Sequence, residues 1–229
     1  MSASKSGSQD KLPQPKALLF DWDSTLVDNW TAIHAAMNVT LGRFSRETWT
    51  VEQCKARVKT SLRDAFPRLF AGQADLALST YLEAYEHIHL QNLAEMPAAS
   101  AMLDAAREIG LYLGIVSNKT GPNLRQEVEH LGWTPRFSRI VGASDAARDK
   151  PAPDPVHLAL GDSGVSPGPD VWFIGDTDID MLCARASGCT GILLNLEAPS
   201  AEIAAAGPAH HVPDCAGFAR LLTTVCLSG

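Results

Sequence analysis

Asp21 and Asp23 stand where an apolar run ends and a turn begins. The run is Ala-Leu-Leu-Phe at residues 17–20, and Ser24 and Thr25 follow the two acids. This pattern places both carboxylates on a loop at the carboxyl end of a buried strand, where open α/β sheets usually bind ligands. Two carboxylates in one pocket require a cation or different protonation states. The alternative is a solvated turn in which the acids are only structural.

Two further segments offer groups that suit a phosphate. Ser117 and Asn118 follow the apolar run at residues 113–116, and a hydroxyl and an exposed backbone amide there can donate hydrogen bonds to phosphate oxygens. Lys150 lies in a loop at residues 149–155 whose prolines stiffen the segment that carries the ammonium. Each segment alone is typical of a solvated loop. Their order and their positions after predicted strands favour a shared site.

A second group of acids follows the apolar run at residues 171–175. Asp176, Asp178 and Asp180 are spaced two residues apart there. Carboxylate oxygens are hard ligands of the kind that Mg²⁺ prefers. The sequence therefore predicts Mg²⁺ as the cofactor.

Taken together, these segments resemble the motifs of the haloacid dehalogenase (HAD) superfamily, in the branch that is similar to phosphoglycolate phosphatases. The resemblance covers roughly residues 17–195. The four family motifs match, in order, Asp21, Asp23 and Thr25; Ser117; Lys150; and Gly175, Asp176 and Asp180. One departure is Ser24, because glycine is usual there in this branch and serine tolerates positive φ less well.

The resemblance implies a covalent mechanism for hydrolysing a phosphate monoester. Asp21 is the expected nucleophile, and Asp23 the general acid and then the general base. The implied metal ligands are Asp21, Asp176 and the backbone carbonyl of Asp23, with help from Asp180. The implied phosphate-binding groups are Ser117, the backbone N–H of Asn118, and Lys150. For Lys119, a substrate contact and a solvated surface position both remain open.

Other activities of the same fold use related sets of residues. A dehalogenase is disfavoured, because halide leaves without a proton and such chemistry does not need Asp23. A phosphomutase would use the same acids, and a non-catalytic binding or regulatory protein could keep the fold. The expected substrate is a small phosphate ester, either phosphoglycolate-like or a sugar phosphate, with nucleoside monophosphates also open.

The rest of the pattern predicts an α/β fold, with a Rossmann-like parallel five-stranded sheet and helices on both faces. The core is expected to comprise residues 17–27 and 98–229. Strand candidates are about residues 17–21, 112–117, 138–142, 171–175 and 191–195. Helical patterns occupy residues 98–109, 121–132, 153–162, 178–188 and 215–226.

Residues 28–97, called the cap here, show helical rather than strand periodicity. Ile33, Met37 and Leu41 are spaced four apart, which predicts a buried helical stripe. Leu76, Tyr81, Leu82, Tyr85 and Ile88 form a second predicted stripe. We expect four helices, which the resemblance implies close over the active site; the alternative is that they only decorate the core. Arg57, Lys59 and Arg63 are the cap's candidate substrate-binding residues.

The overall composition limits the partners. The chain has 229 residues, 45% of them hydrophobic, and a net charge of −7. This charge disfavours nucleic-acid binding, which requires a basic surface, and no apolar run approaches the ~20 residues that span a bilayer. Residues 1–16 read as a disordered tail without a signal segment, and His210-His211 as a solvated loop. A cytoplasmic monomer or homodimer is expected.

Overall fold

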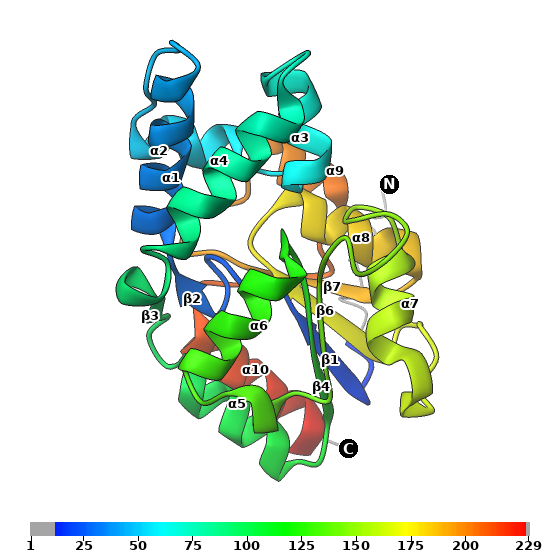
Figure 1. The fold of residues 1–229 in the computed structure, drawn as a ribbon. Helices are drawn as coiled ribbons and strands as arrows, with labels where there is room; N and C mark the ends of the chain where they lie inside the picture. The colour runs from blue at the N-terminus through cyan, green and yellow to red at the C-terminus, as the bar shows by residue number, and fades with distance from the viewer. Residues whose placement is uncertain (1–11, 228–229) are drawn as a thin grey trace, which may run out of the picture.

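The structure is a computed structural model that describes residues 12–227. Its centre is a parallel sheet of six strands in the order β5-β4-β1-β6-β7-β8; Figure 1 labels β4, β1, β6 and β7. The strands are β1 (Ala17–Phe20), β4 (Tyr112–Thr120), β5 (Arg139–Ala143), β6 (Val171–Gly175), β7 (Thr190–Leu194) and β8 (His210–Val212).

The predicted number of five strands is wrong, although all five predicted strands are present. The sixth strand is β8, which contains the histidine pair expected in a loop. Its backbone pairs in parallel with β7, with His210 opposite Ile192. Both histidine side chains are exposed, because β8 lies at the edge of the sheet.

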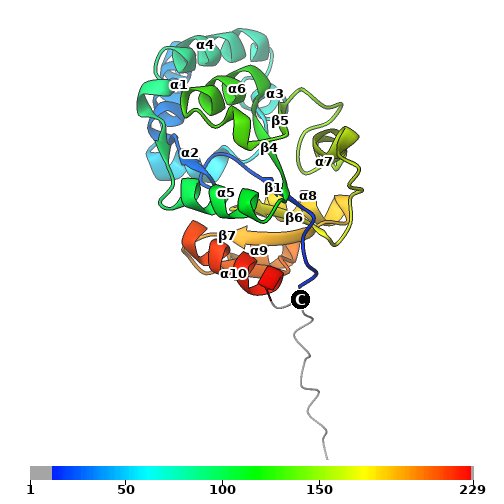
Figure 2. The ribbon, with the colours of Figure 1, turned by 90° about the horizontal axis from the view of Figure 1, so that it is seen from below.

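Helices cover both faces of the sheet, as predicted. They are α5 (Ala99–Glu108), α6 (Gly121–His130), α7 (Asp154–Leu160), α8 (Asp178–Ser187), α9 (Ala201–Ala206) and α10 (Cys215–Leu227), with short 3₁₀ turns η2 (Thr134–Arg136) and η3 (Gly161–Ser163). Figures 1 and 2 show α5 and α10 side by side, with α7 and α8 across the sheet from them. The apolar strands are therefore buried on two sides.

The alternation of side chains along β1 explains why this segment is uniformly apolar. Leu18 and Phe20 pack into the cluster that includes residues of α5, α6 and α10. Ala17 and Leu19 point to the opposite face and pack into the cluster formed with α7 and α8. Because successive residues of a strand face opposite sides of the sheet, each of the four must be apolar.

The helices of the cap lie between two very short strands, β2 (Val27–Asp28) and β3 (Ala94–Glu95), which pair with each other in antiparallel fashion. The sequence pattern missed both strands. The cap contains the four expected helices, α1 (Trp30–Arg43), α2 (Val51–Arg57), α3 (Leu62–Leu69) and α4 (Ala74–Glu86), and a 3₁₀ turn, η1 (Leu90–Asn92). Figure 2 shows α1 and α4 at the end of the molecule opposite α10.

The cap has a hydrophobic core of its own. Ile33, Met37 and Leu41 are buried in it, as the periodicity predicted. In the second predicted stripe, Tyr81 and Tyr85 are buried, but including Leu76 was wrong, since its side chain is 51% exposed. Ala77, four residues before Tyr81, takes the buried position in that turn of α4, so the adjacent Leu76 lies off the stripe.

The described part of the chain begins at residue 12, within the predicted disordered tail. Residues 1–11 of the predicted disordered tail lie outside the described residues. Residues 12–16, which were also assigned to that tail, lie against the core instead: the Trp172 indole donates a 3.1 Å hydrogen bond to the carbonyl of Pro13, and Lys16 pairs with Asp170. Among residues 12–227, no helix combines the length and apolar character needed to cross a membrane.

Candidate active site

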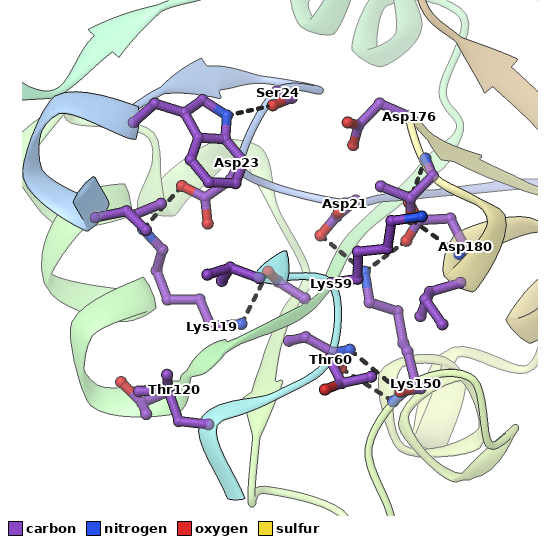
Figure 3. Close-up of a pocket in the computed structure, with 18 of the residues that line it drawn as sticks. Asp21, Asp23, Ser24, Lys59, Thr60, Lys119, Thr120, Lys150, Asp176 and Asp180 are labelled. Carbon is purple, nitrogen blue, oxygen red and sulfur yellow. Dashed lines mark hydrogen bonds and ion pairs between the residues drawn. The ribbon is translucent and has the colours of Figure 1, made fainter. Parts of the chain in front are cut away.

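The predicted core-site residues gather at the carboxyl ends of four neighbouring strands, β5, β4, β1 and β6. β1 lies between β4 and β6, so the chain crosses over from it toward both sides of the sheet. Such a position leaves a crevice at the strand ends. One pocket there brings together seven residues predicted for the core site and one predicted for the cap: Asp21, Asp23, Ser117, Asn118, Lys150, Asp176, Asp180 and Lys59 (Figure 3).

Lys150 is the cation at the centre of this arrangement. Its Nζ lies 2.8 Å from Asp21 Oδ1 and 2.7 Å from Asp180 Oδ1, and its side chain is almost fully buried. Burial opposes the charged form, yet Asp180 and Asp21 together raise the pKa of Lys150 above its usual value. The ammonium therefore stays charged and holds both carboxylates.

The acids around Lys150 exceed the positive charge available to them. Burial and the charge of Asp180 raise the pKa of Asp21, and the same two causes raise the pKa of Asp176 well above its ordinary value. Oxygens of these three carboxylates lie within 4.8 Å of one another. A cluster of carboxylate oxygens at the edge of a pocket is a donor set that suits a hard divalent cation such as Mg²⁺, so the residues present fit the predicted metal.

The turn after β6 fixes Asp180. Thr177 caps α8, because its hydroxyl accepts a hydrogen bond from the Asp180 backbone, while Asp180 Oδ2 accepts from the Thr177 backbone at 3.0 Å and from its hydroxyl at 2.6 Å. Gly175 leaves the necessary space, since a Cβ there would lie 2.4 Å from Asp180 Cγ. The glycine of this motif is thus explained by packing, because only glycine lets Asp180 approach the strand end so closely.

Asp23 has different neighbours from Asp21. Its Oδ1 lies 2.9 Å from Nζ of Lys119, which is itself 6% exposed. Burial raises the pKa of Asp23 to about 6, against the lowering effect of the Lys119 ammonium. A carboxyl group with such a pKa exchanges a proton near neutral pH, as an acid–base catalyst must. The solvated alternative for Lys119 is wrong, because this side chain lies inside the pocket wall.

Ser24 has a positive φ, the backbone conformation expected at a position where the family usually has glycine. Its φ is +62°, in the left-handed region that L-residues rarely occupy. Its hydroxyl accepts a 2.7 Å hydrogen bond from the indole N–H of Trp30, the first residue of α1. Serine thus gives the loop a contact to the cap that glycine could not make. Nearby, the Thr25 hydroxyl donates to Asp176 Oδ1 at 3.4 Å.

Ser117 and Asn118 lie in β4, which runs further than predicted, to Thr120. Ser117 Oγ accepts a 3.2 Å hydrogen bond from the Lys119 backbone N–H. The Asn118 amide group pairs with the backbone of Lys150 in both directions, at 3.0 and 3.1 Å. Asn118 therefore fixes the loop that carries Lys150.

The three cationic cap candidates separate in the structure. Lys59 lines the pocket, and its Nζ is 3.5 Å from Asp178 Oδ1. Arg57 stacks over the Trp49 ring at 4.8 Å, and Arg63 binds Asp149 at 2.8 and 3.1 Å; neither lines the pocket. They diverge because α2 ends at Arg57 and α3 begins at Leu62, so the segment between them turns.

Sequence reasoning missed several pocket residues and their support. The cap side of the pocket has a largely apolar lining, formed by Trp30, Ile33, Val58, Leu62, Tyr81 and Tyr85. Glu127 is fully buried behind Lys119. A signal for it exists: Leu124, Glu127, Val128 and Leu131 follow the three-and-four spacing of a buried helical stripe, so a charged residue stands where an apolar one is expected.

Comparison with known proteins agrees with this geometry. Residues 18–194 match the family model of the haloacid dehalogenase-like hydrolases. A phosphoglycolate phosphatase of Xylella fastidiosa (strain 9a5c) is 32% identical over 178 residues, which are 76% of this chain and 77% of that protein. A phosphoglycolate phosphatase of Yersinia pestis is 29% identical over 93% of this chain and 94% of its own length.

Solved structures share the fold. A haloacid dehalogenase-like hydrolase from Streptococcus pneumoniae superposes with a TM-score of 0.78 at 22% identity, covering 90% of this chain and 97% of that one. A HAD-superfamily hydrolase from Ehrlichia chaffeensis has a TM-score of 0.63 at 24% identity, with coverage of 93% and 98%. The family model spans most of the chain, and the motif residues meet in one pocket. The chain therefore belongs to the haloacid dehalogenase-like hydrolase family, in the branch that resembles phosphoglycolate phosphatases.

Proposed function

We propose that the protein is a Mg²⁺-dependent phosphatase that hydrolyses a small phosphate monoester through an aspartyl-phosphate intermediate. The observation that carries this proposal is the environment of Asp21. Its carboxylate lines the pocket, is held by Lys150 at 2.8 Å, and lies among the oxygens of Asp176 and Asp180. The family and the phosphatases among the relatives support the reaction class.

In the first half-reaction, an Asp21 oxygen attacks phosphorus and the bond to the ester oxygen breaks. Asp23, in its protonated form, gives its proton to the departing alkoxide. Ser117, the Asn118 backbone and Lys150 line the place where the phosphoryl oxygens would lie, and they stabilise the charge that moves onto those oxygens. The alcohol leaves, and the phosphoryl group remains on Asp21.

In the second half-reaction, Asp23 accepts a proton from a water molecule that attacks the phosphorus of the intermediate. Asp21 leaves as a carboxylate, and inorganic phosphate is released. One residue serves as acid and then as base because the two half-reactions move a proton in opposite directions. Bound Mg²⁺, held by Asp21, Asp176 and the Asp23 carbonyl with Asp180 in support, would lower the repulsion between an anionic nucleophile and an anionic ester.

The experiment that tests the proposal is phosphate release from p-nitrophenyl phosphate and a panel of metabolite phosphates. We expect turnover with Mg²⁺, loss of turnover with excess EDTA, and inhibition by Ca²⁺, which prefers more ligands at longer distances. Full activity in EDTA would overturn the role of the metal. If none of the esters released phosphate, the assignment of the protein as a phosphatase would be overturned.

The same panel addresses the substrate and the mutase alternative. Phosphoglycolate is a candidate because relatives carry that name, and sugar phosphates are the second class. Ranking the panel by kcat/KM identifies the preferred ester. A mutase would move the phosphoryl group within a sugar phosphate and release little phosphate, so both products are measured. A cytoplasmic monomer or homodimer without nucleic-acid or membrane partners stays a prediction.

A further inference from the structure

Glu127 is a buried carboxylate with an unusual number of hydrogen-bond donors. It lies on α6 and has no exposed surface. Its Oε1 accepts from Asn29 at 3.1 Å and from Tyr85 and His89 at 2.8 Å, and its Oε2 accepts from the Trp22 indole at 2.6 Å. The Lys119 ammonium donates to both oxygens, at 2.9 and 3.0 Å.

A buried carboxylate at this position costs free energy, which would bring no benefit if Glu127 served only to fill the core. Removing a carboxylate from water costs several kcal/mol before its partners compensate, and an apolar residue of similar size often serves the core equally well. Here the donors compensate fully: because an ionised carboxylate only accepts, each of the five groups, including His89 Nδ1, presents a hydrogen to it. The geometry of the donors therefore depends on Glu127.

Two of these donors belong to the catalytic segments. Trp22 is the residue between Asp21 and Asp23, so its indole ties that loop to α6. Lys119 bridges Glu127 and Asp23, with its Nζ 2.9 Å from an oxygen of each. The Tyr85 hydroxyl accepts from the same ammonium at 2.6 Å. The position of Lys119 in the pocket is thus set from three sides.

We propose that Glu127 is a positioning residue of the active site: it holds the Lys119 ammonium and the Trp22 indole so that the Asp23 carboxyl group stays aligned with the leaving-group oxygen. This inference rests on the proposed function, in which Asp23 protonates that oxygen. Glu127 does not contact the reacting atoms itself.

The same carboxylate also joins the cap to the core. Tyr85 lies on α4, His89 follows that helix, and Asn29 precedes α1, so three of the five donors come from the cap. Their shared acceptor lies on α6 of the core. The cap is therefore fixed at the place where the acid–base residue is aligned, and a correctly seated cap and a correctly placed Asp23 require the same contacts.

The test compares two esters that differ in their need for an acid. A primary alkyl phosphate must have its leaving oxygen protonated, whereas the p-nitrophenolate of p-nitrophenyl phosphate leaves without a proton. With saturating Mg²⁺, Glu127→Gln should lower kcat/KM about 100-fold for the alkyl ester and less than about threefold for the aryl ester. The ratio kcat/KM reports only steps up to departure of the alcohol, so later hydrolysis of the intermediate does not enter.

A matched control and a second variant complete the design. Glu129→Gln removes the same charge from an exposed position of the same helix and should leave kcat/KM unchanged for both esters. Lys119→Met should reproduce the selective loss, and adding Glu127→Gln to it should cause little further loss, because the two residues act as a unit. If Glu127→Gln fails to fold, Lys119→Met must still show the selective loss.

The outcomes separate the two proposals. Equal losses on both esters, or additive losses in the double variant, would overturn the positioning role, since a displaced cap or partial unfolding affects both esters alike; the phosphatase assignment would stand. If the wild-type protein released phosphate from neither ester, the proposed function would fail and the inference would fail with it.

Discussion

Asp21 is a carboxylate placed where a carboxylate is costly. Burial and the charge of Asp180 raise its pKa, and Lys150 opposes them with its charge and a hydrogen bond. The site therefore holds more negative charge than its one adjacent ammonium can offset, which is useful only if a cation binds there. The same charge excess predicts how a neutral replacement behaves.

Asp21→Asn should abolish turnover, by at least about a thousandfold, because an amide of the same shape cannot attack phosphorus. It should also raise the thermal melting temperature of the metal-free protein, since it removes a buried charge and its repulsion with Asp180. Steady-state assays and thermal melts in EDTA measure the two effects. Retained activity would show that Asp21 is not the nucleophile.

Among the structural elements, the end of β6 shows how a strand positions a catalytic acid. Gly175→Ala would place a methyl group 2.4 Å from Asp180 Cγ, so the acid must move, and Lys150 loses one of its two carboxylates. Misplacement on the scale of 1 Å can cost about 100-fold in rate, and we expect a loss of that size. Gly42→Ala, a helix position with open space around it, is the control and should retain activity.

The loop between α2 and α3 should carry substrate choice, because the core site handles only the phosphoryl group. If the preferred substrate has a second anionic group, Lys59→Ala should cost about 2 kcal/mol in kcat/KM on that substrate and much less on p-nitrophenyl phosphate. Arg57→Ala, whose guanidinium stacks on Trp49 away from the pocket, is the control. Equal losses on both esters would place specificity elsewhere.

The sequence was most informative where an element is buried on both faces. The runs of β1 and β6 are uniformly apolar, so their ends, and with them Asp21 and Asp176, could be predicted. Strand β8 was missed because it has three residues, lies at an edge and carries two exposed histidines. The position of Lys119 was not predicted either: the apolar spacing around Glu127 marks a buried charge on a helix, but its pairing with Lys119 forms only in the assembled core.

Across the whole molecule, the cap and the core meet at Glu127, and this has a consequence for acid stability. Burial alone would raise the pKa of Glu127, but Lys119 and the donors on His89 and Tyr85 lower it from its ordinary value of 4.5 to about 2. A lowered folded-state pKa means that the carboxylate stabilises the protein above pH 4.5. That stabilisation is lost as the pH falls from 4.5 toward 2.

As the pH falls through this window, the wild type should lose about 3 kcal/mol more of its free energy of unfolding than Glu127→Gln, which has no carboxylate to protonate at this position. Denaturant unfolding at several pH values from 5 down to 2, a range that brackets the window, measures this difference in the free energy of unfolding. Glu129→Gln, on the exposed face of α6, should keep the wild-type slope. Parallel curves for the wild type and Glu127→Gln would contradict the lowered pKa.

The covalent role of Asp21 can be measured most directly by locating the phosphoryl group during turnover. Asp23→Asn should slow hydrolysis of the intermediate but still accept a phosphoryl group from p-nitrophenyl phosphate, whose leaving group needs no proton. After acid quenching, mass spectrometry of peptides should find one phosphoryl group, on Asp21, and none in the Asp21→Asn/Asp23→Asn variant. A phosphorylated residue elsewhere, or a burst of p-nitrophenolate without phosphorylated Asp21, would contradict the covalent mechanism.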